Sequence, residues 1–331
     1  MRKLWVVLLW MPAWLWADSH AYVVASGENY KTPGAITPLN TTERTLGESF
    51  FVPIGGYILA IPPGSKEVWQ VVSAPECICP PFAINVLDPA SGATLATIPL
   101  ATTASVLIFD PAGRFAYVEL GNGDVLKIAV ASRKVVLTAS VGVGAFVFSS
   151  DGSKLFTTGE SSGSAVVVLD PQSLQPVGEI PLPSPAGELF VTGNTLLIVD
   201  GLELLFFDTA TLKQTNSVPI SPDVFGYVFA VGPDRSRIYL SQIGWTGNFT
   251  IEAIDAASGQ LLVSRTVPAV NTYPIFLSAD GSQIIVASTP ALFLDAKTLA
   301  ITKRLVPVGT PNSAAYIDSE TSFCFSAPPA P

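Results

Sequence analysis

The feature that most constrains the fold is a turn motif that recurs about every 43 residues along the chain. The motif opens with an Asp that follows an apolar residue, and it leads into a strand that ends in a segment such as Ile180-Pro181-Leu182. A fixed period of this size is typical of repeat architectures in which each unit stacks on its neighbours. Clear copies begin at Asp88, Asp170, Asp208, Asp255 and Asp295, and weaker copies are counted from Leu39 and Val130.

A second recurring mark is a short turn that precedes an apolar strand between these copies. Asp151-Gly152 precedes Leu155-Phe156, and Asp280-Gly281 precedes residues 284–286. Asp-Gly between apolar runs is a signal for a β-hairpin. Each unit therefore reads as four short strands, and no segment shows helical periodicity. The chain is predicted to be all-β, a single β-propeller of seven four-stranded blades, because this arrangement leaves only short sheet edges exposed.

The repeats resemble those of the YVTN-repeat β-propellers of bacterial and archaeal surface proteins. In that family an Ile-Asp-Thr-type turn is followed by a strand ending in Ile-Pro-Val-Gly, an inner strand, an Asp-Gly turn and a Tyr-Val-Thr-Asn strand. Residues 166–181, 141–156 and 305–309 follow this pattern, although the tetrapeptide Tyr-Val-Thr-Asn itself does not occur. The resemblance covers nearly all of the mature chain and implies a seven-bladed propeller, without implying a particular chemistry.

The N-terminus has the pattern of a secretory signal peptide. Met1-Arg2-Lys3 is basic, and residues 4–16 form an apolar stretch that is too short for a membrane anchor. Cleavage is expected after Ala17 or after Ala21, and the second site fits the small-x-small rule better. No later apolar run is long enough to span a bilayer. We therefore expect a signal peptide over 1–21, a propeller over 22–326 and a free proline-rich tail over 327–331. The protein would be secreted, periplasmic or held at the cell surface.

Composition excludes several classes of function. The 331 residues include one His and three Cys, and the net charge of −9 argues against nucleic acid as a partner. Cleavage after Ala21 would remove His20, and with it Ser-His-Asp catalysis and His-ligated zinc. A chain that is 49% hydrophobic and 13% charged is not disordered in bulk. No cofactor and no metal site is predicted, and we expect a monomer.

The two ends of the chain are expected to complete one blade together. Strands are predicted over 21–26, 35–39 and 50–54 near the N-terminus, and over 314–317 and 322–326 near the C-terminus. Such sharing satisfies edge hydrogen bonds that a gap would expose. Residues 21–26 and 322–326 suit the same position in this blade, and the sequence does not choose between them.

The three cysteines raise the question of a disulfide. Cys77 and Cys79 flank Ile78, and Cys324 lies far along the chain. In a secreted chain a disulfide is a more natural role than metal binding by a Cys-x-Cys pair. If the termini share a blade, Cys324 lies one blade from the Cys77 loop, so a bridge to Cys77 or Cys79 would secure the closure. The alternative is that the cysteines pack as unpaired thiols.

The recurring aspartates are expected to be structural. An Asp that opens a turn can accept backbone N–H groups two or three residues further on. One such residue per blade spreads the carboxylates around the ring instead of gathering them into a catalytic site. The same interpretation applies to Asp151 and Asp280.

The candidate binding site is the face from which the long loops emerge. The links from second to third strand are long at 26–34, 73–81 and 241–248. Exposed aromatic rings among amides suit a sugar or a peptide, because the rings offer flat apolar surface with polar edges. The alternative is that these loops only decorate the fold. The candidate ligand-binding residues are Tyr30, Tyr57, Trp245, Asn248, Asn271 and Tyr273.

Two functions are consistent with these features. The favoured one is an exported, non-enzymatic propeller that binds a cell-surface glycan or a protein, or is displayed at the cell envelope. The alternative is an enzyme on the same fold, a lactonase-like hydrolase or a quinoprotein-type dehydrogenase with a site in the central channel. The predicted inner strands over 105–110, 145–149, 188–191 and 275–278 are mostly apolar, and only Glu188 begins one with a charge. This pattern favours the non-enzymatic function.

Overall fold

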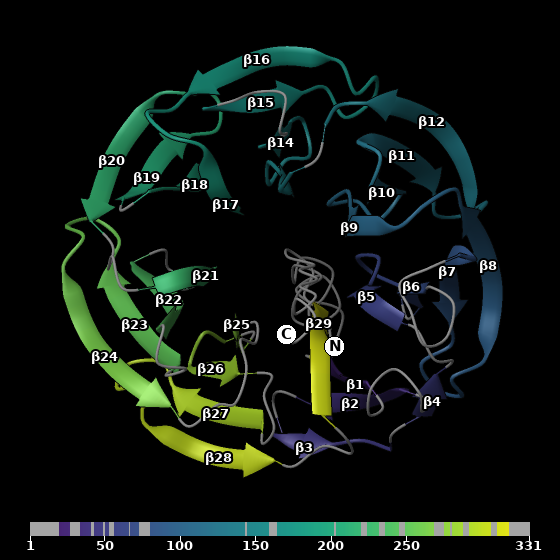
Figure 1. Ribbon diagram of the computed structural model, residues 1–331. Helices are drawn as coiled ribbons and strands as arrows, with labels where there is room; N and C mark the ends of the chain where they lie inside the picture. Colours follow the sequence, from purple (N-terminus) through teal and green to yellow (C-terminus); the bar gives the residue numbers. More distant parts are fainter. Residues whose placement is uncertain are drawn as a thin grey trace, which may run out of the picture.

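The computed structural model shows seven antiparallel β-sheets arranged in a ring, so the predicted all-β propeller is confirmed (Figure 1). Each sheet is one blade, and we number the blades 1 to 7 along the chain from the blade that contains the first and last described strands. The described residues include no helix that could cross a membrane. The structure describes residues 20–26, 34–40, 43–48, 50–52, 56–65, 67–72, 80–142, 144–158, 164–201, 203–219, 224–231, 236–244, 249–267, 275–278, 280–286, 291–305 and 310–317.

Blades 2 to 7 each consist of four strands that follow one another in sequence. The innermost strands are β5 (Gly56–Ala60), β9 (Ala104–Phe109), β13 (Phe146–Phe148), β17 (Ala186–Thr192), β21 (Val224–Val231) and β25 (Ile275–Leu277). The second strands are β6 (Val68–Val72), β10 (Phe115–Leu120), β14 (Leu155–Thr157), β18 (Thr195–Asp200), β22 (Arg237–Gly244) and β26 (Gln283–Val286). The third strands are β7 (Phe82–Leu87), β11 (Asp124–Ala129), β15 (Ala165–Leu169), β19 (Glu203–Asp208), β23 (Phe249–Asp255) and β27 (Ala291–Asp295). The outermost strands are β8 (Thr94–Leu100), β12 (Lys134–Ser140), β16 (Pro176–Pro181), β20 (Gln214–Pro219), β24 (Leu261–Val267) and β28 (Ile301–Leu305).

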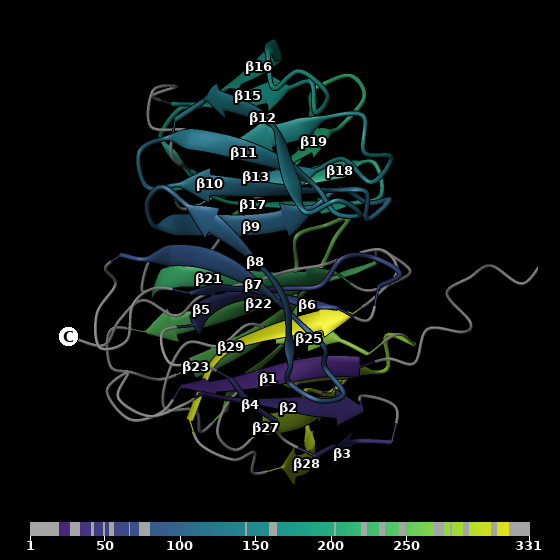
Figure 2. The same cartoon turned by 90° about the vertical axis from the view of Figure 1, so that its right-hand side faces the viewer.

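Blade 1 joins the two ends of the described chain. The C-terminal strand β29 (Thr310–Ile317) pairs antiparallel with β1 (His20–Ser26), which brings Val23 opposite Ala314 (Figure 2). The segment over 21–26 therefore takes the second position of the blade, and the competing segment over 322–326 lies outside the described residues. The blade is completed by β2 (Gly34–Asn40), β3 (Thr45–Leu46) and β4 (Phe50–Val52), with β3 and β4 both paired to β2.

The core lies between neighbouring blades, because each sheet packs one face against the preceding sheet and the other face against the following sheet. Strands near the axis are consequently mostly apolar, and all five residues of β6, including Gln70, are buried. Aromatic rings fill two of these interfaces. Trp69 meets Phe109 edge-on between blades 2 and 3, with ring centroids 5.3 Å apart, and Tyr117 meets Phe148 between blades 3 and 4 at 5.0 Å. Each large side chain buried in this way stabilises the fold by about 1.5–3 kcal/mol.

Four of the six large apolar side chains that are exposed on the outermost strands have a common structural cause. In blades 2 to 7 the pairing of the third and outermost strands shifts by one residue near the start of the outermost strand, which is a β-bulge. In blades 5 and 7 the extra residue is Thr215 or Thr302, and its hydroxyl donates to a third-strand carbonyl at 3.2 Å. In the other blades the extra residue is apolar and exposed: Leu95, Val136, Val177 and Leu262. Bulges of this kind protect an edge strand from pairing with another chain.

The observed loops differ from the predicted ones in two places. β22 continues to Gly244, so the third of the expected long links spans only residues 245–248. In blade 4, β14 ends at Thr157 and β15 begins at Ala165, so the link between them is long, whereas the sequence predicted a short one.

Candidate functional site

The two faces of the ring are built differently. On one face, which we call the turn face, lie the turns from first to second strand and from third to outermost strand. The opposite face, which we call the loop face, holds the links from second to third strand and the links between blades. The strand order in each blade places these connections on opposite faces because successive strands are antiparallel.

The aspartates of the turn face are structural, as predicted. Asp170 accepts N–H groups from Gln172 and Ser173 at 2.8 Å and the Ser173 hydroxyl at 3.0 Å. These contacts lower the pKa of Asp170, with the Ser173 N–H contributing most. Asp208, Asp255 and Asp295 accept the same pair of groups from the Thr or Ser three residues on.

The same turns share a left-handed residue at their fifth position. The φ angle there lies between 55° and 73° in all seven blades, at Arg44, Gly92, Arg133, Leu174, Leu212, Gly259 and Leu299. This spacing puts the turns of blades 1 and 3 at Asn40 and Ala129. The starts of these two turns, which the sequence placed at Leu39 and Val130, were each wrong by one residue. Neither turn has the Asp that marks the first position elsewhere.

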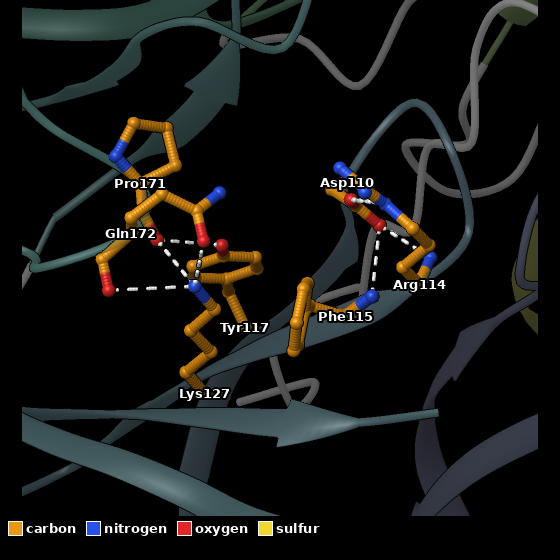
Figure 3. Close-up of polar contacts among 7 residues, drawn as sticks. All are labelled: Asp110, Arg114, Phe115, Tyr117, Lys127, Pro171 and Gln172. Carbon is orange, nitrogen blue, oxygen red and sulfur yellow. Dashed lines mark hydrogen bonds and ion pairs between the residues drawn. The ribbon is translucent and has the colours of Figure 1, made fainter. Parts of the chain in front are cut away.

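A buried lysine joins blade 3 to the aspartate turn of blade 4 (Figure 3). The Lys127 ammonium, on β11, donates to the Pro171 carbonyl and to the Gln172 side-chain oxygen, each at 3.0 Å. It lies 4.3 Å from the centroid of the Phe115 ring, and the Tyr117 hydroxyl donates to the same Pro171 carbonyl at 2.8 Å. Burial lowers the pKa of Lys127.

Sequence reasoning missed Lys127, although its signal is visible once the blades are aligned. The equivalent third-strand positions are apolar in the other four-stranded blades: Val86, Val168, Phe206, Ala253 and Phe293. Other cations of the turn face also donate to a carbonyl of the next blade. Lys154 reaches Thr209 at 2.8 Å, Arg237 reaches Lys297 at 3.3 Å, and Lys303 reaches Arg44. The turn face is therefore engaged in holding blades together.

The predicted ligand-binding residues fall on the loop face or outside the described residues. Tyr57 lies in β5, where the pairing with β6 skips it as an extra residue. Five other candidates lie outside the described residues: Tyr30, Trp245, Asn248, Asn271 and Tyr273. The predicted disulfide also lies outside them, since it involves Cys324 with Cys77 or Cys79.

A bulge at the loop-face end recurs in four innermost strands. The extra residues are Tyr57 in β5, Ser105 in β9, Gly187 and Glu188 in β17, and Phe225 and Gly226 in β21. Bulges at the rim of a closed β-structure redirect side chains and are frequent beside active sites. We call this level of the ring the channel mouth.

Two serine–carboxylate pairs lie at the channel mouth. Ser105 is exposed, and its hydroxyl donates to Oε2 of Glu119 at 3.0 Å, while Glu119 itself is only 2% exposed. The other oxygen of Glu119, Oε1, accepts the Gly144 N–H of blade 4 at 2.5 Å. In blade 5 the Ser184 hydroxyl donates to Asp200, which is also buried. The sequence did not reveal these pairs, because the bulges that align them are not readable from spacing.

Glu188 belongs to the same level of the ring. Its side chain is solvent-accessible, yet the protein around the bulge partly desolvates it and raises its pKa. Among the described residues there is no group of three or more His, Cys, Asp or Glu side chains placed to hold a metal ion. The chemistry that these residues offer is hydrogen bonding and proton transfer by serine and carboxylate.

Comparisons with known proteins agree on the fold. No family model matches the sequence, and no curated protein matches it. A putative 6-phosphogluconolactonase from Bacteroides fragilis is 13% identical with a TM-score of 0.70, and the match covers 93% of this chain and 100% of that one. The periplasmic gluconolactonase PpgL of Pseudomonas aeruginosa is 17% identical with a TM-score of 0.66, covering 91% and 99%.

A third solved structure is not described as a lactonase. Hsv2 of Kluyveromyces lactis is 11% identical with a TM-score of 0.65, covering 86% of this chain and 100% of that one. Likeness at such identities concerns the fold alone, so the protein is a β-propeller, and the comparisons do not extend to the narrower YVTN-repeat family.

Proposed function

We propose that this protein is an exported β-propeller that binds a cell-surface glycan or a protein segment on its loop face. The observation that supports this most is the difference between the two faces. Cations and aspartates of the turn face are engaged in turns and blade contacts. At the channel mouth, by contrast, Ser105 and Glu188 remain accessible on bulged strands. The resemblance to YVTN-repeat surface proteins supports display at the cell envelope.

Export is part of this proposal. β1 begins at His20, so cleavage after Ala17 would leave the strand whole, whereas cleavage after Ala21 would remove its first two residues. We therefore favour the cut after Ala17. Expression in a bacterial host, followed by intact mass measurement of the exported protein, distinguishes the two sites, and a mass that includes residues 1–17 would contradict export.

A propeller hydrolase is the second candidate. Two of the solved structures named above are described as lactonases, and the Ser105–Glu119 pair offers a nucleophile beside a base. A thermal-shift panel of cell-wall glycans, lactones, quinone cofactor and Ca²⁺ separates the candidates. A ligand at 100 times its Kd stabilises the fold by about 2.7 kcal/mol. A shift with a glycan supports the binding protein, and a shift with a lactone accompanied by turnover supports the hydrolase.

Trp245→Ala tests whether the loop face binds the ligand. An exposed binding residue contributes contact area and little stability, so we expect weaker ligand binding and a change in the free energy of unfolding of less than about 1 kcal/mol. Isothermal titration and urea denaturation measure the two quantities. Unchanged affinity, or a collapsed fold, would contradict the assignment of Trp245.

A further inference from the structure

The fold does not require a carboxylate at the position of Glu119. Glu119 pairs with Val125 of the third strand, and the equivalent pairs in blades 2 and 5 are Val71 with Ile84 and Val199 with Leu204. Val71 and Val199 are both buried. An aliphatic side chain thus satisfies the packing in those two blades, whereas a buried carboxylate must be stabilised by hydrogen bonds.

The hydrogen bonds of Glu119 give its two oxygens different partners. Gly144 N–H donates to Oε1, and the Ser105 hydroxyl donates to Oε2. The proton of Ser105 is therefore directed at a buried carboxylate, while Ser105 itself is exposed on β9. A nucleophile within hydrogen-bond reach of a base, with the base oriented by a third group, is the arrangement that activates serine in covalent catalysis.

The backbone around the pair is fixed by short turns. The Gly121 N–H donates to the Thr103 carbonyl at 2.8 Å, and the Gly123 N–H donates to the Leu120 carbonyl at 2.9 Å. The strand that carries Glu119 is thereby tied to the segment that leads into β9. A site built on strands with such support holds its geometry without a ligand.

We propose that Ser105 is a nucleophile for acyl transfer from carboxylic esters, with Glu119 as its general base. Oγ of Ser105 forms a bond to the ester carbonyl carbon as its proton passes to Oε2 of Glu119, and the carbonyl π electrons move to the oxygen. The tetrahedral intermediate then expels the alcohol, which takes the proton from Glu119, and leaves an acyl-Ser105. Water attacks next with the same proton route, which releases the carboxylic acid and restores Ser105. This activity rests on the second candidate function, the hydrolase, and gives it a reaction sequence and a class of substrate.

A fluorophosphonate probe tests the proposal on the mature protein. We expect one adduct per chain by intact mass, located on Ser105 by peptide mass spectrometry, and no adduct on Ser105→Ala. Glu119→Gln should slow labelling by about 100-fold or more, as general-base catalysis implies. Turnover of p-nitrophenyl acetate should fall in the same two variants.

Matched controls are present in the same chain. Ser140 is exposed and donates to Asp124, which is partly exposed, so Ser140→Ala should label at the wild-type rate. Ser184 donates to buried Asp200 and is the alternative nucleophile. Three outcomes would each overturn the proposal. They are labelling of Ser184 in place of Ser105, labelling of Ser105 that is no faster than labelling of Ser140, and no labelling at all. Ser105→Ala keeps the test decisive if Glu119→Gln fails to fold. The glycan arm of the thermal-shift panel is independent of all these results, so failure of the esterase and failure of glycan binding are distinguishable.

Discussion

At the scale of single residues, Asp151 on the turn face makes the stability of the fold depend on pH. The Ser149 hydroxyl at 2.6 Å and the Ser153 N–H at 3.0 Å hold the pKa of Asp151 at about 2, below its ordinary value of 3.8. A carboxylate with a lowered pKa stabilises the folded state above its unfolded value, and this contribution is lost as the pH falls through the folded value. The pKa values of Asp170 and Asp295 are lowered in the same direction.

We therefore expect the thermal midpoint of the protein to fall between pH 4 and pH 2. Asp151→Asn should destabilise the protein at pH 7 and lose most of that difference at pH 2, where the wild-type carboxylate is also being protonated. Differential scanning calorimetry at several pH values measures this convergence. A constant difference across the range would mean that the charge of Asp151 makes no contribution.

The contribution of Glu188 to stability should depend on pH in the opposite sense to that of Asp151. Partial desolvation raises its pKa, so the folded state binds the proton more tightly than the unfolded state does. Its contribution to stability therefore falls as the pH rises from the unfolded value through the folded one. Glu188→Gln is expected to raise the thermal midpoint slightly at pH 7 and to leave it unchanged at pH 4. The effect is small because the side chain is accessible. A lower midpoint at pH 7 would contradict this reasoning.

The residues differ in how far the sequence could predict their roles. The structural role of Asp170 follows from local chemistry, since its partners lie two and three positions away. Lys127 reaches a turn that lies 44 positions along the chain, and Glu119 pairs with Ser105 across a bulge. Both depend on the register between strands or blades, which local sequence patterns do not encode.

At the scale of elements, two turn glycines form a matched pair. Gly259 and Gly64 have φ angles of +73° and +72°, where an L side chain is strained. A Cβ on Gly64 would meet no atom within 4 Å, whereas a Cβ on Gly259 would lie 2.7 Å from Cγ2 of Val218 in the neighbouring blade. Gly64→Ala therefore measures backbone strain alone, and Gly259→Ala adds a contact between blades 6 and 5.

We expect Gly64→Ala to lower the free energy of unfolding by about 1 kcal/mol. Gly259→Ala should lower the free energy of unfolding by about 1–3 kcal/mol more than Gly64→Ala does, which is the usual effect of overpacking a filled interface. Urea denaturation of both variants measures the difference. Equal losses would show that Val218 can move aside and that this interface is loosely packed.

The prediction of elements succeeded where a local signal repeats and failed where one does not. Asp-Gly turns located the hairpins that lead into β14 and β26, because such turns need a residue with positive φ at a fixed offset. The link from β14 to β15 was missed because its residues carry no comparable mark. The bulges of the innermost strands also have no signature in the sequence, and they determine which side chains line the channel mouth.

At the scale of the whole molecule, the ring is held by contacts that differ between its faces. Cations of the turn face join one blade to the carbonyls of the next, as Lys127 does for blades 3 and 4 (Figure 3). At the loop face the Glu119 carboxylate joins the same two blades through Gly144. The interface of blades 3 and 4 is thus secured at both ends, which supports a rigid channel mouth at Ser105.

Closure of the ring depends on the pairing of β29 with β1, and a pair of truncations tests it. A chain that ends at Gly309 lacks β29, whereas a chain that ends at Ile317 retains it, so their difference isolates this strand. Without β29 the inner edge of β1 loses its partner over His20 to Ser26, and the exposed edge becomes free to pair with other chains. We expect the shorter chain to unfold at a markedly lower temperature and to associate in size-exclusion chromatography. Losing the pairing of β29 with β1 should cost several kcal/mol of folding free energy. That is a large part of the roughly 5–15 kcal/mol that stabilises a typical domain. Equal thermal midpoints for the two truncated chains, with both remaining monomeric, would show that the ring closes without its terminal strand.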